Sequence, residues 1–411
     1  MNASTPARGR DLARRIGWVE RLSAKPFDAI LDRIDEGLQF GTIEASFPDG
    51  TVRIFGGRGA GPNAVVSLHR WRGLLRLATS GSVGWYEAWA ANEWSSPDSV
   101  PLFDLFMRNR ATLGRAARGG GISRIIKRAR HWLHRNNRSG ARRNIIAHYD
   151  LGNDFYAAWL DLTMSYSSAL FVDSTQSEAL SEAQQRKMDA TLDRLDLSPG
   201  QTLLEIGCGW GGLLARASGR GIKAVGLTLS PSQKRYADHA LAGSATVSLT
   251  DYRDISGQFD GIASVEMVEA VGQEYWPDFL DSVSRCLKSG GRAAIQFISI
   301  ADDIFESYAS SADFIQTFIF PGGMLLSTSR FRALAEARGL SWTAQHDFGQ
   351  DYAETLRRWR ENFDAALEQG GLPQGFDGRF VALWRYYLMY CEGGFRSGGI
   401  QVSQVTLVKQ A

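Results

Sequence analysis

The sequence has few cysteines: only Cys208, Cys286 and Cys391 occur among its 411 residues. Because their number is odd and their positions lie far apart, they argue against a disulfide framework and indicate a reducing compartment. Cys-x-x-Cys pairs and the His-Glu-x-x-His pattern are also missing. Neither a structural nor a catalytic zinc site is therefore expected, and no metal is assigned.

Long apolar runs and a dominant charge are missing as well. No stretch reaches about 18 uninterrupted apolar residues, so no transmembrane helix is expected. No apolar core follows the basic residues near the N-terminus, so no signal peptide is expected. Lys and Arg total 46 against 44 Asp and Glu, and this net charge of +2 identifies no partner. The length and the 44% of apolar residues suggest two or three folded domains.

The positive charge is concentrated in one segment, since residues 108–143 contain twelve Lys or Arg and no Asp or Glu. Its apolar residues are spaced for one face of a helix, at Ile122, Ile125, Ile126, Ala129, Trp132 and Leu133. A basic amphipathic helix of this kind suits an anionic membrane surface. The alternative is an inter-domain linker whose apolar edge packs on the protein. No recognised nucleic-acid motif accompanies the charge, so nucleic acid is not an expected partner.

Residues 1–107 are interpreted as a small domain of their own. Pro48-Asp49-Gly50 separates two strand-like runs, at 41–47 and 51–55, which predicts a β-hairpin. The apolar segments downstream contain four tryptophans, Trp71, Trp85, Trp89 and Trp94. These side chains would either line a pocket for an apolar ligand, as in a lipid-binding domain, or form the domain core.

Strand-like and helical patterns alternate through residues 144–411, which are interpreted as one domain. The predicted strands are Thr202–Ile206, Ala224–Leu227, Thr246–Leu249, Gly261–Val265, Arg292–Ile298, Leu340–His346 and Gln401–Val408. Alternation of this kind predicts an α/β fold, with a mostly parallel sheet covered by helices on both faces.

The most informative short run is a buried strand that ends in a glycine-rich turn and opens a helix, at 203–218. Glycines let the backbone approach a ligand at the carboxyl edge of a sheet. No Lys-Ser or Lys-Thr follows, so the turn is not a P-loop. Glu205, Gly207, Gly209 and Gly211 form Glu-x-Gly-x-Gly-x-Gly, which resembles motif I of the class I S-adenosylmethionine-dependent methyltransferases.

Two further segments fit a nucleotide-like cofactor. Thr228, Ser230 and Gln233 lie where the second strand meets its helix, at the expected place of the adenosyl ribose. Ser230 followed by Pro231 is also typical of a helix N-terminus. Asp251 lies where a loop would approach the adenine, although it would also serve as an ordinary loop carboxylate.

Further motifs make a closer match. They are 148–156 with 164–171, 264–272, 319–323 and 387–396. Taken in order, these motifs resemble the cyclopropane-fatty-acyl-phospholipid synthase family over residues 144–409. The resemblance implies a class I methyltransferase fold, which is doubly wound with a mostly parallel seven-stranded sheet, and a smaller N-terminal α+β domain. It also implies S-adenosylmethionine as cofactor and makes a homodimer plausible.

The resemblance also implies roles for single residues. Tyr166 and Ser167 would contact the methionine end of the cofactor. Glu269, Tyr352 and Cys391 match positions around a bicarbonate ion that the family binds. The family usually has Cys in place of Ser168 and His in place of Gln296, both near that ion. Because glutamine cannot carry a proton as histidine does, Gln296 bears on the deprotonation step rather than on methyl transfer.

The chemistry implied is transfer of a methyl group to a cis double bond of a phospholipid acyl chain. An alkene has no proton to remove beforehand, so the reaction depends on positioning and on stabilising the resulting carbocation. Glu269 is the carboxylate expected near the cation. Glu266, three residues earlier, would share its helix face, and burial would decide between them.

Loss of a proton from the new methyl would give a cyclopropane, and loss from a neighbouring carbon a methyl-branched alkene. The rival hypotheses are a methyltransferase for a small soluble acceptor and a non-catalytic lipid-binding protein with a methyltransferase fold. The leading hypothesis places the enzyme in the cytoplasm, peripherally on the inner face of the membrane.

Overall fold

The computed structural model describes residues 18–113, 151–173, 178–310 and 312–410. These residues form two compact units, described separately below. The first unit comprises the described residues up to 113 together with 310–317 and 377–399. The second comprises the rest. Most of the predicted basic segment, 114–143, lies outside the described residues.

The first unit contains a four-stranded mixed sheet in the order β2-β1-β3-β4. Its strands are β1 (Thr42–Ser46), β2 (Val52–Gly56), β3 (Asn63–Leu68) and β4 (Trp94–Ser95). The predicted hairpin is confirmed, since β1 and β2 pair antiparallel across the turn at 48–50. In this turn Asp49 accepts a hydrogen bond from the Thr51 amide at 3.0 Å, and Gly50 has a φ of +79°.

Helices from both ends of the sequence complete the first unit. They are α1 (Trp18–Gly37), α2 (Arg72–Ala90), α3 (Val100–Arg108), α4 (Arg110–Leu113) and α16 (Gly378–Arg396). Helix α16 packs closely on α3, because a Cβ at Gly393 would lie 2.5 Å from the Cβ of Phe103. Residues 377–399 thus pack with the N-terminal residues, whereas the sequence interpretation grouped them with 144–411.

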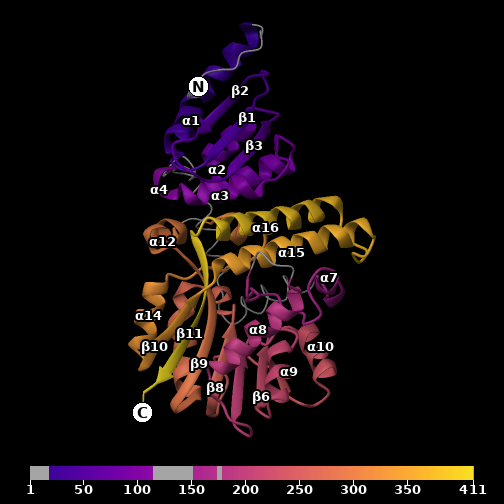
Figure 1. Cartoon of the computed structure of the whole chain (residues 1–411), viewed down its shortest axis with the longest axis vertical. Coiled ribbons are helices and arrows are strands. Elements are labelled where there is room, and N and C mark those ends of the chain that lie inside the picture. Colours follow the sequence, from indigo (N-terminus) through magenta and orange to yellow (C-terminus); the bar gives the residue numbers. More distant parts are fainter. Residues whose placement is uncertain (1–17, 114–150, 174–177, 311, 411) are drawn as a thin grey trace, which may run out of the picture. The chain divides into compact units, whose positions relative to one another are not determined.

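The second unit is built on a seven-stranded sheet in the order β10-β11-β9-β8-β5-β6-β7 (Figure 1). Its strands are β5 (Thr202–Ile206), β6 (Lys223–Thr228), β7 (Thr246–Leu249), β8 (Phe259–Val265), β9 (Leu287–Ile300), β10 (Leu340–Asp347) and β11 (Ile400–Lys409). Strands β9, β8, β5, β6 and β7 pair in parallel. Strand β11 runs antiparallel to both of its neighbours. The predicted mostly parallel sheet is confirmed.

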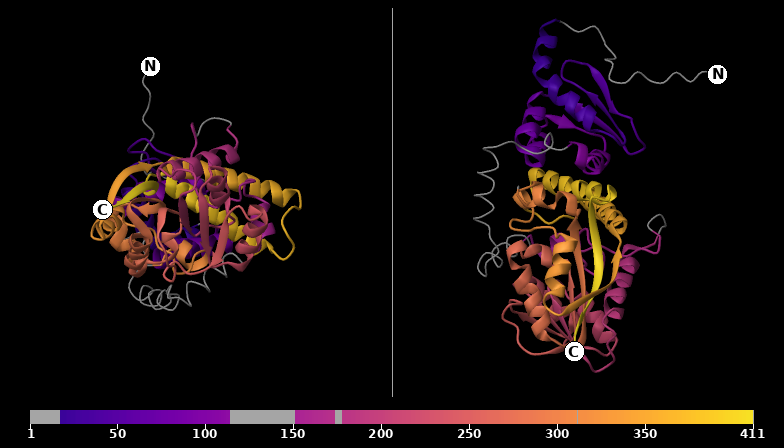
Figure 2. Two further views of the ribbon diagram at one scale, coloured as in Figure 1. Left: turned by 90° about the horizontal axis from the view of Figure 1, so that it is seen from below. Right: turned by 90° about the vertical axis from the view of Figure 1, so that its left-hand side faces the viewer.

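Helices cover both faces of this sheet (Figure 2). The helices of the second unit are α7 (Asn153–Ala157), α8 (Leu180–Asp193), α9 (Gly212–Gly219), α10 (Pro231–Leu241), α11 (Trp276–Cys286), α12 (Asp302–Ala309), α14 (Thr328–Glu336) and α15 (Gly349–Glu368). The short α13 (Phe314–Phe318) belongs to the first unit except for its last residue.

Successive side chains along the strands pack alternately into two separate hydrophobic cores. Leu203 packs with residues of α8, α9 and α10, whereas Leu204 packs with residues of α11 and α14. In β9, Ala294 belongs to the first of these cores and Ile295 to the second. Because successive strand residues face opposite sides, a strand buried on both faces reads as a continuous apolar run.

Within the part of the chain that the structure describes, none of the helices combines the length and apolar character needed to cross a membrane.

Candidate active site

The turn after β5 brings backbone to the carboxyl edge of the sheet. Gly207 and Gly209 have φ values of +85° and +53°, which favour glycine. The amides of Gly207 and Cys208 donate to the Leu227 carbonyl at 3.0 and 2.9 Å, which ties the turn to β6. A Cβ at Gly207 would lie 2.7 Å from the Cγ of Met267. The turn is therefore closed to any larger residue at this position.

A cavity opens beside this turn, and most of the predicted cofactor residues line it. These are Tyr166, Ser167, Glu205, Gly207, Gly209, Thr228, Gln233 and Asp251. Two predicted residues lie outside the lining. A Cβ at Gly211 would face Ala237 and Leu241 of α10, and the Ser230 hydroxyl accepts a hydrogen bond from the Gln233 amide at the start of that helix. Ser230 is thus the predicted helix cap, and Gly211 lies where the turn packs on α10.

The charges in the cavity suit a zwitterionic amino-acid group that also carries a positive sulfur. Glu205 is 3% exposed, and its Oε2 lacks a hydrogen-bond partner among the described residues. Burial raises the pKa of Glu205 to about 8, against the charge of Lys187. Lys187 is equally buried and donates to the Ser167 hydroxyl at 2.6 Å. A cationic group beside Glu205 would favour its ionised form. The cavity therefore fits the methionine end of S-adenosylmethionine.

The loop after β6 and the loop at Asp251 are ordered by their own side chains. Thr228 donates to the side-chain oxygen of Gln233 at 2.8 Å and accepts from the Ser230 amide. Asp251 forms a bidentate ion pair with Arg253, with distances of 2.8 and 2.6 Å. Both Asp251 and Arg253 line the cavity. Both loops, where the ribose and the adenine were expected, are thus held in place beside the cavity.

Glu266, which directly follows β8, accepts three hydrogen bonds through its carboxylate. Glu266 Oε1 accepts from the Ser168 amide at 2.9 Å and from Gln296 Nε2 at 2.7 Å. Glu266 Oε2 accepts from the Tyr352 hydroxyl at 2.7 Å. Burial raises the pKa of Glu266, while these three donors and the charge of Lys187 act in the opposite direction. Glu266 also lines the cavity, so this carboxyl group faces the cofactor site.

A buried chain of side chains fixes which way the Gln296 amide points. The guanidinium of Arg194 donates to Gln404 Oε1 at 3.1 Å. Because Arg194 has only donors, Gln404 must turn its amide nitrogen the other way, and Nε2 donates to Gln296 Oε1 at 3.0 Å. Gln296 therefore presents its own nitrogen to Glu266. The donor of this contact does not titrate, whereas a histidine at the same place would.

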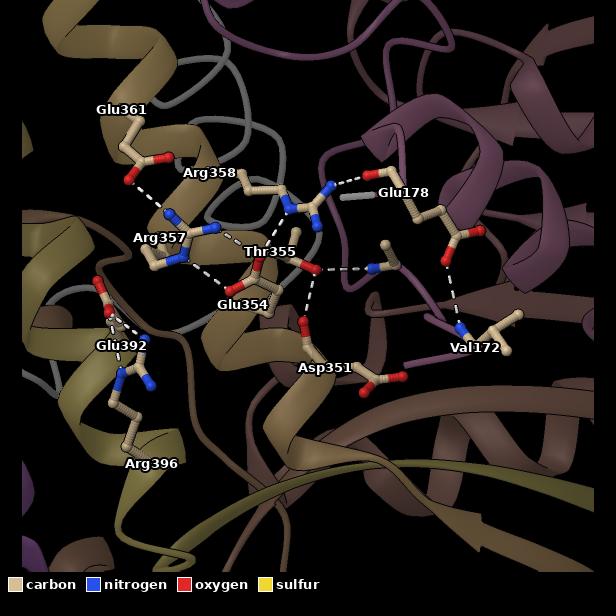
Figure 3. A network of polar contacts seen from close by, with 11 residues as sticks. Val172, Glu178, Asp351, Glu354, Thr355, Arg357, Arg358, Glu361, Glu392 and Arg396 are labelled. Atoms are coloured by element: carbon tan, nitrogen blue, oxygen red, sulfur yellow. Dashed lines mark hydrogen bonds and ion pairs between the residues drawn. The ribbon is translucent and has the colours of Figure 1, made fainter. Parts of the chain in front are cut away.

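Helix α15 holds the segment that carries Ser168. The Ala169 amide donates to the Thr355 hydroxyl at 3.1 Å, and this hydroxyl donates to the Asp351 carbonyl at 2.7 Å (Figure 3). The Phe171 amide donates to the Asp351 carboxylate at 2.9 Å. One turn along α15, the pair of Glu354 and Arg358 is fixed by a hydrogen bond from Arg358 to the Glu178 carbonyl (Figure 3). These contacts direct the Ser168 amide at Glu266.

The expected carboxylate, Glu269, has different surroundings. Its Oε1 accepts from the Ile298 amide, and its Oε2 lacks a hydrogen-bond partner among the described residues. Burial, followed by the charge of Glu266, raises the pKa of Glu269 to about 8. The expectation that both carboxylates share a helix face is wrong. Glu266 has a φ of +49° and precedes the short turn at Val268–Ala270, so the two side chains leave the backbone differently.

A pKa of about 8 means that the Glu269 carboxyl is mostly protonated at neutral pH, and the substitution Glu269→Gln tests this. A carboxyl whose pKa is higher in the folded state stabilises the fold below its unfolded pKa of about 4.5 and loses that contribution as the pH rises through about 8. The free energy of unfolding should therefore fall over this range by an amount on the order of 5 kcal/mol from Glu269. Urea titrations at several pH values should show a shallower pH dependence for Glu269→Gln. An unchanged slope would mean that Glu269 is ionised at neutral pH.

The fifth predicted catalytic residue, Cys391, lies on α16 in the first unit. Its thiol pKa is raised by burial and then by the charge of Asp313, a residue of the same unit. Neutral thiols of this kind behave as small apolar groups.

Sequence reasoning missed two contributors to the site. Lys187 lies in a helix whose pattern gave no functional signal, and Gln404 lies on the last strand. Both act through buried polar contacts between distant segments, which no local pattern reveals. Glu266 was considered but placed second to Glu269.

The class of protein now follows from fold and site together. The sheet order, the acidic glycine turn and the cavity at the carboxyl ends of the parallel strands define a class I S-adenosylmethionine-dependent methyltransferase. The coclaurine N-methyltransferase bound to N-methylheliamine and S-adenosylhomocysteine shares this fold, with a TM-score of 0.59 at 17% identity over 76% of this chain and 94% of that one.

Residues 136–405 match the model of the family described as mycolic acid cyclopropane synthetase, and the chain belongs to this family. The tuberculostearic acid methyltransferase of Mycobacterium tuberculosis is 36% identical over 367 residues, which cover 84% of this chain and 83% of that protein. The cyclopropane-fatty-acyl-phospholipid synthase of Escherichia coli is 37% identical over 262 residues, 63% of this chain and 65% of that protein.

Solved structures agree with this assignment. A mycolic acid cyclopropane synthase complexed with S-adenosylhomocysteine and CTAB has a TM-score of 0.61 at 33% identity, over 65% of this chain and 98% of that one. The protein is therefore an S-adenosylmethionine-dependent methyltransferase of the family that contains the cyclopropane synthases and fatty acid methyltransferases.

Proposed function

We propose that this enzyme transfers the methyl group of S-adenosylmethionine to a cis double bond in the acyl chain of a phospholipid. The observation that carries the proposal is the Glu266 carboxylate, which faces the cofactor cavity and is held by three donors. An anion fixed in this way suits a reaction that creates positive charge on an apolar substrate. Membership of a family of lipid-modifying enzymes supports the same substrate class.

The residues of the chain supply position and electrostatics. The cofactor, when bound, supplies an electrophilic methyl group. Glu205 and Lys187 suit its charged methionine end, and the glycine turn allows its close approach. Beside Glu266 the cavity wall is apolar, with Val265, Met267 and Val271. Such a wall limits access of water to a carbocation, and the fixed carboxylate stabilises its charge.

Two products are compatible with one cation, a cyclopropane and a methyl- or methylene-branched chain. The cyclopropane outcome is the one favoured by the family motifs. The branched outcome is favoured by Gln296, which stands where the family usually has histidine, and by a relative matched over 84% of this chain and 83% of its own length. That relative is named a methyltransferase rather than a cyclopropane synthase. Methyl transfer is the step common to both products, and the number of deuterium atoms retained from a labelled methyl group, together with proton NMR, distinguishes them.

The test uses S-adenosylmethionine with a trideuterated methyl group. The protein is incubated with vesicles of cis-unsaturated phospholipid, and the acyl chains are analysed by mass spectrometry. Two retained deuterium atoms would show that the transferred methyl lost a proton, and proton NMR then distinguishes a cyclopropane from a methylene branch. Three retained deuterium atoms would indicate a methyl-branched alkene.

Absence of label from every unsaturated lipid would contradict the proposal. The remaining candidate would then be a methyltransferase for a small soluble acceptor on the same fold. Tight binding of S-adenosylmethionine in calorimetry, with no methylation of lipid, is the result expected for that alternative.

We also propose that the enzyme acts at the anionic inner surface of the membrane through residues 108–143, where the net positive charge is concentrated. A Lys or Arg near an anionic surface contributes about 1 kcal/mol, so Lys127→Gln with Arg128→Gln should weaken vesicle binding by about 30-fold. Co-sedimentation with vesicles of phosphatidylserine and phosphatidylcholine measures this. The double variant Lys223→Gln with Lys234→Gln removes the same charge elsewhere. An equal loss in both would assign binding to overall charge.

A further inference from the structure

The donors assigned to a bicarbonate ion by the family resemblance are already engaged. Three positions near that ion carry Ser168, Gln296 and Tyr352 in this chain, and all three donate to one carboxylate, that of Glu266. Gln296 is held in this role by Gln404. The Ser168 hydroxyl is turned away and donates to the Ala169 carbonyl at 2.9 Å.

A separate bicarbonate ion does not fit this arrangement. It would have to take the same three hydrogen bonds, each of which is made at 2.7 to 2.9 Å by Glu266. If it lay beside Glu266 instead, two negative charges would meet in a buried site, which is costly. The chemistry of the donor set is thus satisfied by a carboxylate that belongs to the chain.

The backbone of Glu266 is strained in the conformation that brings its carboxylate to these donors. Its φ of +49° lies in the left-handed region, which non-glycine residues rarely adopt. Such strain persists where the surroundings hold it in place, and it is common at functional sites. Here the Glu266 amide donates to the Gln296 carbonyl at 2.8 Å, which fixes the backbone next to the side-chain contact.

We propose that the Glu266 carboxylate occupies the anion position of this active site, so that the chain carries its own general base and requires no bicarbonate. This inference rests on the proposed function for the identity of the reaction, but the assignment of the anion position rests on the contacts alone. It assigns to Glu266 the role that the motif comparison gave to a bound ion and placed near Glu269.

The step assigned to Glu266 balances without another reactant. The alkene π pair forms a C–C bond to the methyl carbon while the electrons of the C–S bond remain on sulfur, which leaves S-adenosylhomocysteine and a carbocation. Glu266 then takes a proton from the carbon skeleton beside the cation. The electrons of the broken C–H bond close the ring or form a new double bond. The proton on Glu266 leaves before the next turnover.

The test compares Glu266→Gly with Glu266→Gln in buffer freed of carbon dioxide. Glycine removes the carboxylate, relieves the backbone strain and leaves the three donors open, whereas glutamine keeps the space filled. Wild-type turnover should be unchanged by added bicarbonate. Both variants should lose about 100-fold or more in turnover, and bicarbonate or acetate should restore a large part only in Glu266→Gly.

Binding of ¹³C-labelled bicarbonate, followed by NMR, gives a readout that needs no turnover. Glu266→Gly should bind it, and the wild type should not. The matched control is Ala242→Gly, which relieves the same kind of strain, with a φ of +47° at the end of α10. It should keep wild-type activity and should not respond to bicarbonate.

A wild-type enzyme that stops without bicarbonate, or that binds it as Glu266→Gly does, would overturn the inference. So would a folded Glu266→Gly that binds S-adenosylmethionine but neither binds bicarbonate nor loses activity. A wild type that methylates no lipid would instead count against the proposed function, and the contrast in bicarbonate binding would still test the role of Glu266.

Discussion

Replacing Gly207 by alanine is expected to weaken S-adenosylmethionine binding by about 100-fold or more. Two effects combine. Alanine at a φ of +85° costs about 1–2 kcal/mol. In addition, the new methyl group would lie 2.7 Å from Met267 Cγ and 3.0 Å from its Cβ, atoms too near the backbone to move freely. The turn must then shift, and displacements on the order of 1 Å in a binding site can cost about 100-fold.

Isothermal titration calorimetry with S-adenosylmethionine measures this effect, and Gly200→Ala is its control. Gly200 has a similar φ of +89° and no atom within 4 Å of the added methyl, and it precedes β5 away from the cavity. Gly200→Ala should lower the melting temperature through its backbone angle alone and should bind the cofactor normally. Equal losses of binding in both variants would assign the effect to general destabilisation.

The second large effect is expected for Tyr352→Phe. The substitution keeps the ring, whose centroid lies 6.1 Å from that of Trp359. It removes the hydroxyl that donates to Glu266 Oε2. Loss of one donor to a catalytic anion typically costs about 100-fold in kcat. Cofactor affinity should be unchanged, because the hydroxyl contacts Glu266 and not the glycine turn.

The pH profile separates this role from a structural one. The Tyr352 hydrogen bond lowers the pKa of Glu266, so its loss should raise that pKa. Since the ionised form is the base, the acid limb of kcat should move to higher pH. Lys187, which favours the ionised form, and Glu269, which is influenced by the charge of Glu266, are unchanged in this variant.

Tyr386→Phe is the matched control for Tyr352→Phe. Tyr386 lies in the first unit, and its buried hydroxyl lacks a hydrogen-bond partner among the described residues. Its removal should leave kcat and the pH profile unchanged. A fall in kcat for Tyr352→Phe without movement of the acid limb would show that the hydroxyl supports packing rather than the ionisation of Glu266.

The strands were predictable because buried parallel strands read as apolar runs. The predicted bounds of β5 and β7 agree with the structure residue for residue. The prediction for β9 was too short, at 292–298 instead of 287–300, because Gly290 and Gly291 interrupt the pattern. The structure has a register shift at this place, and Gly290 has a φ of +74°. Glycines that end a strand and glycines that distort one look the same in a sequence.

The site was predictable as a set of residues but not as a set of contacts. The family motifs placed Ser168, Gln296 and Tyr352 near one anion, and the structure brings their donors to one carboxylate. Which carboxylate this is depends on the backbone angle at Glu266 and on the burial of Glu269. Both are consequences of tertiary packing. A spacing of three residues suggested one α-helix, whereas only a short 3-10 helix, Val268–Ala270, is present, and it leaves out Glu266.

The packing of α16 with the N-terminal residues has a consequence for synthesis of the chain on the ribosome. Domains usually fold in the order in which they are made. The first unit cannot follow this rule, because part of its core, including Trp384, Tyr386 and Phe395, is translated more than 250 residues after α3. Its N-terminal strands and helices keep an incomplete apolar surface until α16 has been made. This unit is therefore the one expected to depend most on chaperones during translation.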